Sequence, residues 1–307
     1  MKKLFIINVI WIAALSTLHL SAQKAHQELS VYGGCGLSTL RYKLPSPNST
    51  SFNGDRKAAF GGDFGVGYTY FVGESSSGKW SYAVHSGLEG GLYIAKANVK
   101  HGVTIKENQT DKHGVTIEDI LKDNEGDQFR LRSTISDYEE TQKMWLLSIP
   151  VMGMVKIDWF YGMGGFKFGL PVGRKFESAG KNLLNEAEYY DQRAVGIDNW
   201  LTAPKFQGYG NFTEWDSYEK IKYNVTVLLS LEAGGRFALS EKYILYAGAY
   251  FDYGINNSLN KSYEHLVNYR INHAENVEFN TNSVLSAFTE KVNVMSAGIK
   301  IRLAMKL

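Results

Sequence analysis

Eight charged residues stand out because each lies in a segment made mostly of apolar, aromatic and small residues. Four are acids and four are bases, so they can pair with one another. Pairing is how charged groups are tolerated in a protein interior of low dielectric constant. We expect them to form a structural charge network rather than a catalytic or conducting site. These residues are Asp63, Glu89, Lys167, Glu232, Arg236, Asp252, Lys300 and Arg302.

Residue types that support catalysis or metal binding are otherwise sparse. His85 is the one histidine inside these segments, and we expect it to be a hydrogen-bonding residue rather than a catalytic base. His101 and His113, with Asp111 or Glu118, offer only a loosely spaced set of metal ligands. The chain contains no HExxH, CxxC, GxSxG, P-loop or Rossmann motif. The sequence therefore predicts no enzyme activity, no metal and no cofactor.

The segments that carry the eight charges alternate with a period of two. From Phe60 to Tyr70, apolar and aromatic residues occupy the even positions, and small or polar residues occupy the odd ones. This alternation is typical of β-strands with two different faces. It predicts about eight strands, at residues 29–40, 60–70, 80–94, 145–156, 160–170, 225–237, 245–253 and 295–305.

The lengths of the strands and of their connections favour a membrane barrel over a soluble β-sandwich. Sandwich strands usually run about 5–6 residues, which is shorter than these. The connections alternate between short and long, as in up-and-down barrels with short periplasmic turns and long extracellular loops. The expected short connections are 72–79, 157–158 and 240–242, and the long ones are 42–56, 97–140, 172–222 and 256–290. We therefore expect an all-β, transmembrane, up-and-down antiparallel β-barrel whose apolar face meets lipid and whose narrow lumen is filled by side chains.

The N-terminus and the overall charge agree with export to a membrane. Lys2 and Lys3 precede an apolar run at residues 4–15, and small residues before Gln23 offer a cleavage site. We expect residues 1–22 to be a signal peptide for the Sec pathway and residues 23–307 to be the barrel domain in the outer membrane. A net charge of +2 lacks the basic excess of a nucleic-acid-binding protein. Glycine, at 31 of 307 residues, suits strands that face a crowded lumen.

Specific binding is expected in the long loops, because loops on a rigid scaffold carry most recognition residues. An HGVTI sequence occurs at 101–105 and again at 113–117, which we interpret as a duplicated loop hairpin. Residues 116–123 and 178–192 have helical spacing and capping residues, so they predict short surface helices. The third long loop is rich in aromatics, which suits either a contact surface or a small loop core. We expect outer-membrane lipid around the barrel, and an envelope protein or glycan partner at loops 97–140 and 172–222.

Several strand motifs resemble one family. The segment LLSIPV at 146–151 is similar to the "YLxIPLLLK" strand of PorT-like outer-membrane β-barrel proteins, which are common in Bacteroidetes and are often labelled "porin family". WFYGMGGFKFGL at 159–170 resembles that family's following hairpin strand, and the order of motifs matches from about residue 28 onward. Ser148 departs from the family pattern, which has a glutamate before Ile-Pro. The resemblance implies a barrel and supplies no catalytic residues.

These observations lead us to expect a structural or interaction protein of the envelope. A small pore and, less favoured, an enzyme carried by the loops are the alternatives.

Overall fold

Eight long strands and a set of short elements make up the part of the protein that the structure describes. The computed structural model describes residues 26–42, 54–75, 79–99, 103–106, 109–110, 116–117, 121–122, 128–189, 201–202, 212–260, 266–271 and 277–307. The long strands are β1 (Gln27–Tyr42), β2 (Gly54–Glu74), β3 (Trp80–Val99), β8 (Gln128–Ile157), β9 (Phe160–Tyr189), β12 (Thr226–Ala238), β13 (Tyr243–Gly254) and β16 (Val292–Lys306). The short elements are β4 (Val103–Lys106), β5 (Gln109–Thr110), β6 (Thr116–Ile117), β7 (Leu121–Lys122), β10 (Leu201–Thr202), β11 (Phe212–Glu219), β14 (Val267–Ile271), β15 (Val277–Thr281) and the helix α3 (Val284–Phe288).

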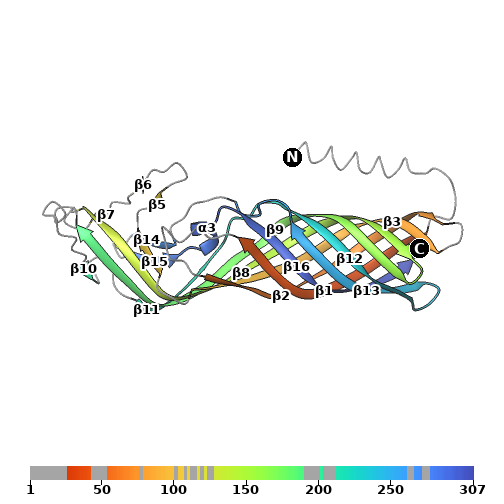
Figure 1. Cartoon of the computed structure of the whole chain (residues 1–307), viewed down its shortest axis with the longest axis horizontal. Helices are drawn as coiled ribbons and strands as arrows, with labels where there is room; N and C mark the ends of the chain where they lie inside the picture. Colours follow the sequence, from red (N-terminus) through yellow and green to blue (C-terminus); the bar gives the residue numbers. More distant parts are fainter. Residues whose placement is uncertain are drawn as a thin grey trace.

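The eight long strands close into a ring. Each pairs antiparallel with its neighbour in the order β1, β2, β3, β8, β9, β12, β13, β16, and β16 pairs with β1. Consecutive long strands are therefore neighbours throughout, which confirms the predicted up-and-down antiparallel barrel of eight strands. Figure 1 shows the strands running obliquely along the long axis, with the C-terminus at one end and the short elements gathered at the other.

The connections follow the predicted alternation of short and long. β2 and β3, β8 and β9, and β12 and β13 are joined by short turns, and the tightest leaves only two residues between Ile157 and Phe160. Asp158 in that turn has a positive φ of 51°, as two-residue hairpins require. The strand ends that the four long connections join lie at the opposite end of the barrel.

The outer wall of the barrel is apolar. Phe60, Phe64 and Ile299 are each more than 60% exposed, and the remaining outward positions of the strands are mostly Leu, Val, Ile, Phe and Trp. A continuous exposed apolar wall on a closed barrel is the surface that membrane barrels present to lipid. No helix among the described residues is long and apolar enough to cross a membrane.

Two strands are much longer than the sequence predicts. β8 and β9 each contain 30 residues, and they pair with each other from Ile157 and Phe160 out to Phe129 and Tyr189. They extend beyond the other strands, and with β4, β7, β10 and β11 they form an extension of the barrel sheet that we call the raised sheet (Figure 1). Much of the expected loops 97–140 and 172–222 is therefore strand.

The two helices predicted in these loops are wrong. Residues 178–189 belong to β9, because backbone pairing with β8 on one side and β11 on the other outweighs their helical spacing. Within 116–123, residues 116–117 and 121–122 are strands. The two HGVTI copies also pair differently: Val103–Lys106 pairs with β8, whereas Thr116–Ile117 pairs with β5. The two histidines of the repeat and the signal peptide lie outside the described residues.

Candidate functional site

Five of the eight predicted charges meet in one buried group inside the barrel. Lys167 on β9 lies 2.7 Å from Glu89 on β3 and 2.9 Å from Asp252 on β13. Lys300 on β16 lies 3.0 Å from Asp63 on β2 and 3.1 Å from the second oxygen of Glu89. All five side chains are at most 4% exposed. Glu89 thus bridges both ammonium groups and links β3, β9 and β16, which are not neighbours in the ring.

Two more charges form a second group beside the first. Arg302 on β16 donates a hydrogen bond of 2.9 Å to Glu232 on β12. The hydroxyl of Tyr161 donates a bond of 2.8 Å to the same carboxylate. His85 contacts Arg302 at 3.1 Å and the hydroxyl of Thr69 at 2.8 Å. We call these two groups together the charge layer, and His85 belongs to it as a hydrogen-bonding neighbour.

Aromatic rings and glycines fill the space around the charge layer. Lys300 lies 5.0 Å from the ring centroids of both Tyr32 and Tyr250, and the Arg302 guanidinium lies 4.8 Å from that of Tyr32. A Cβ on Gly65 would lie 2.7 Å from the Tyr32 ring, so only glycine fits there. Cation–π contacts and close packing therefore hold both cations within the layer.

Arg236 does not join the charge layer. It is half-buried near the end of β12, opposite Tyr246 in the β12–β13 ladder, and the Tyr246 hydroxyl donates a hydrogen bond of 2.8 Å to Glu28. Within the charge layer, four acids therefore face three bases. The sequence placed Arg236 on the correct face of its strand. Strand periodicity does not show which residues of different strands lie at the same level along the barrel axis, so it could not show that Arg236 lies nearer the short turns.

The charge layer contains the one metal-like cluster found among the described residues. Carboxylate oxygens of Asp63, Glu89 and Asp252 lie within 4.8 Å of one another. Lys167 and Lys300 already occupy the cationic positions against these oxygens. The donor set therefore suits buried ammonium groups better than a metal ion.

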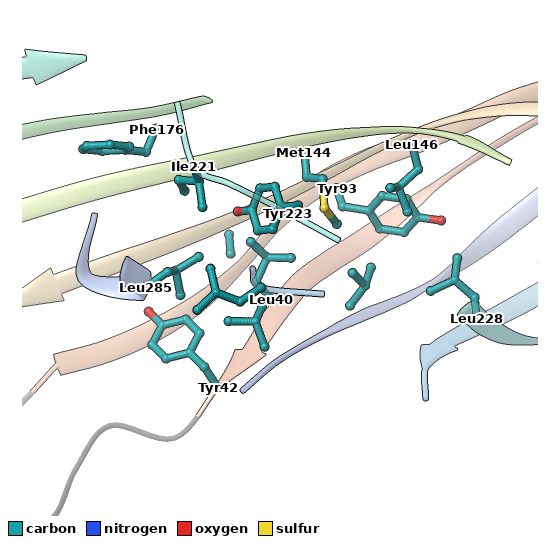
Figure 2. Close-up of a cluster of buried hydrophobic side chains, with 14 residues drawn as sticks. Leu40, Tyr42, Tyr93, Met144, Leu146, Phe176, Ile221, Tyr223, Leu228 and Leu285 are labelled. Carbon is teal, nitrogen blue, oxygen red and sulfur yellow. The ribbon is translucent and has the colours of Figure 1, made fainter. Parts of the chain in front are cut away.

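Apolar side chains pack against both sides of the charge layer. Toward the short turns, Met152, Met154, Met163, Tyr161 and Tyr246 belong to one cluster. Toward the long connections, a second cluster includes Leu40, Met144, Leu146 and Leu228 from the wall (Figure 2). The inward face of the barrel is thus less polar than the sequence predicted. Alternation shows which residues share a face, but it does not show whether that face is polar.

The second cluster also receives segments from the long connections. Ile221 and Tyr223 from the β9–β12 connection, and Leu259 and Leu285 from the β13–β16 connection, are at most 4% exposed within it. Figure 2 shows Ile221, Tyr223 and Leu285 lying among side chains of the wall. We call residues 221, 223, 258–259 and 281–287 the plug, because they pack inside the wall at the mouth of the barrel.

Glu140 on β8 fastens the plug. This buried carboxylate accepts hydrogen bonds from Tyr138, Gln142 and Ser283, and from the backbone N–H of Val284 at 2.9 Å. Burial raises the pKa of Glu140, although these four donors favour its charged form. No ion pair of Glu140 is found among the described residues. Neighbouring bonds between Ser178 and Thr281 and between Ser217 and Thr281 fasten the same segment.

Comparison with known proteins adds little to these observations. No protein-family model matches the chain, and no curated protein matches it. Solved structures with some similarity include Ail of Yersinia pestis (8% identity, TM-score 0.26, 92% of this chain and 99% of that chain). They also include the outer membrane protein OprG of Pseudomonas aeruginosa (9%, 0.27, 92% and 97%) and the outer membrane protease OmpT of Escherichia coli (11%, 0.28, 94% and 99%). Similarity this low supports no conclusion about function, so the barrel assignment rests on the strand pairing of the chain itself.

Sequence reasoning missed Glu140 and the plug. Glu140 and Gln142 continue the inward positions of Met144, Leu146 and Ser148, so extending the β8 alternation toward the N-terminus would have found them. Ser148 lies opposite Glu89 in the β3–β8 ladder.

Proposed function

We propose that this protein is an outer-membrane barrel with a closed lumen that acts as a structural or interaction protein through its extracellular end. The filled lumen is the observation that carries this proposal. The charge layer, the apolar clusters on both sides of it and the plug occupy the interior between the short turns and the mouth. A barrel of eight strands has an interior just wide enough for such side chains.

The exposed apolar wall supports placement in a membrane. Trp80, Tyr82, Trp159 and Phe160 surround the end with the short turns, and Trp145 lies twelve residues along β8 from Ile157. At about 3.4 Å per residue and a tilt near 40°, twelve residues span roughly 30 Å, which suits a bilayer core. The predicted signal peptide and Sec export support the outer membrane, and the long connections are then extracellular.

The sheet that rises above this belt supports an interaction role. Its outer face carries exposed charges of both signs, including Asp137, Glu139 and Lys181. We propose that this sheet, built from the expected loops 97–140 and 172–222, binds an envelope protein or glycan. We propose no enzymatic role, because His85, the one lumenal histidine of the described strands, contacts Arg302 and Thr69 deep within a packed interior.

We also propose membership of the PorT-like family. The support is the order of the motifs in the sequence, together with the pairing of residues 146–151 on β8 with β9, the strand that contains residues 160–170.

Co-purification from detergent-solubilised outer membranes tests the interaction role. A triple variant, Asp137→Ala with Glu139→Ala and Lys181→Ala, changes the outer face of the raised sheet. A control, Glu241→Ala with Lys242→Ala, changes exposed charges at the turn between β12 and β13 instead. We expect a cross-linked partner to be recovered with the wild type and the control and to be lost with the triple variant. Recovery of the same proteins with all three overturns the proposal.

A further inference from the structure

The barrel wall is interrupted on one side. β11 pairs with β9 from Leu183 to Phe176, and β12 pairs with β9 in the same register from Gly169 to Phe160. Between these two ladders, residues 170–175 and 220–225 face each other without ladder pairing, although both segments are described throughout. One continuous hairpin ladder thus contains a gap six residues long.

The local sequence explains the gap. Ile221 and Tyr223 turn into the lumen and join the plug. Residues 220–225 pair instead with the connection that follows β13, through a single bridge between Tyr223 and Leu259. On β9, Pro171 lacks an N–H, and a bulge falls at Val172, where Trp145 pairs with Gly173 and Leu146 pairs with Pro171. Residues 220–225 therefore pack toward the plug and form no ladder with residues 170–175.

The gap is apolar at one end and basic at the other. Leu170, Val172 and Val225, at the end nearer the membrane, are 50–65% exposed. Arg174, Lys175, Lys220 and Lys222 lie at the extracellular end and are exposed. The two facing segments contain these four cations and no acid.

The level of the gap coincides with the membrane interface. Trp145, an exposed aromatic residue of the kind found in interfacial girdles, lies opposite Gly173. Two other lysines of this sheet already pair with acids: Lys143 lies 2.9 Å from Glu177, and Lys181 lies 3.8 Å from Glu214. Arg174 and Lys220 have no such acid among the described residues.

We propose that this gap binds the phosphorylated headgroup of an anionic lipid of the outer leaflet. The acyl chains lie along Leu170, Val172 and Val225, and the phosphate meets Arg174 and Lys220. Guanidinium and ammonium groups form strong charge-assisted hydrogen bonds with phosphate, and a planar guanidinium can do so through two N–H groups. The inference rests on the proposed outer-membrane placement.

Native mass spectrometry of the full mature protein tests this site. Protein folded in neutral detergent is titrated with bisphosphorylated lipid A, with the same lipid dephosphorylated, and with lipid A in the presence of inorganic phosphate. The site variant is Arg174→Gln with Lys220→Gln. The matched control is Lys143→Gln with Lys181→Gln, which removes two cations of the same sheet. Each preparation is first checked for the heat-dependent gel shift of a folded barrel and for insertion into neutral phosphatidylcholine vesicles.

We expect the wild type and the control to prefer phosphorylated lipid A, and the site variant to bind it about ten-fold or more weakly, because two interfacial cations are lost. Equal binding of the phosphorylated and dephosphorylated lipids overturns the inference, as does an equal loss in both variants. Full displacement by millimolar phosphate would show a site for the free anion and would also overturn it. Failure of the folded wild type to insert into vesicles would instead overturn the proposed membrane placement.

Discussion

Glu89 holds two buried lysines at once, so its replacement by glutamine should weaken the charge layer severely. Its two oxygens lie 2.7 Å from Lys167 and 3.1 Å from Lys300, and all three side chains are about 2% exposed. Removing one partner of a buried ion pair typically costs about 3–5 kcal/mol. Asp252 and Asp63 still neutralise the two lysines in part. We therefore expect Glu89→Gln to lower the free energy of unfolding by about 3 kcal/mol, near the lower end of that range.

The assay is urea unfolding in neutral-lipid vesicles, followed by tryptophan fluorescence and by the heat-dependent gel shift. The control is Glu177→Gln, which breaks an ion pair to Lys143 whose side chains are 37% and 51% exposed, so it should cost less than about 1 kcal/mol. In the double variant of Glu89→Gln with Lys167→Met, the losses should fall short of additivity by about 1 kcal/mol or more, because the two residues share one interaction. Equal losses in Glu89→Gln and the control would refute the reasoning.

Two further predictions concern the plug and the packing of the lumen. Because burial raises the pKa of Glu140 above its ordinary value of 4.5, the folded state holds that proton more tightly than the unfolded state. The free energy of unfolding of the wild type, relative to that of Glu140→Gln, should therefore be greatest in acid and should fall as the pH rises above about 4.5 through the raised pKa. A difference between the two proteins that does not change between pH 4 and 8 would contradict this. Gly65→Val should cost about 1–3 kcal/mol, because the Cβ would lie 2.7 Å from the Tyr32 ring. The control is Gly153→Val on the outer wall, where the nearest atom is Gly164 O at 3.8 Å, and it should leave the urea midpoint unchanged. Equal losses of stability in the two variants would show that crowding in the lumen is not the cause.

The alternation of the strands was sufficient to predict the ring and the two faces of its wall. Outward Phe64 and inward Asp63 follow from a period of two, because a strand in a barrel has only those two directions. Seven of the eight predicted charges therefore lie together in the charge layer, and Arg236 differs only in its height along the barrel.

The plug and the raised sheet were beyond such reasoning. Val284 and Leu285 are buried because a connection folds back into the mouth, and no local period encodes that return. The length of β9 is set by its partners β8 and β11, so the helical spacing at 178–192 was misleading. Contacts between residues far apart in the sequence determine both the burial of the plug and the length of β9.

The conductance of the purified full-length mature protein in a planar lipid bilayer tests the central claim, a sealed lumen, most directly. With insertion confirmed in parallel by the heat-dependent gel shift, the packed charge layer and the plug predict no steady ohmic current at moderate voltage. A steady, reproducible channel from the folded wild-type protein would contradict the sealed lumen.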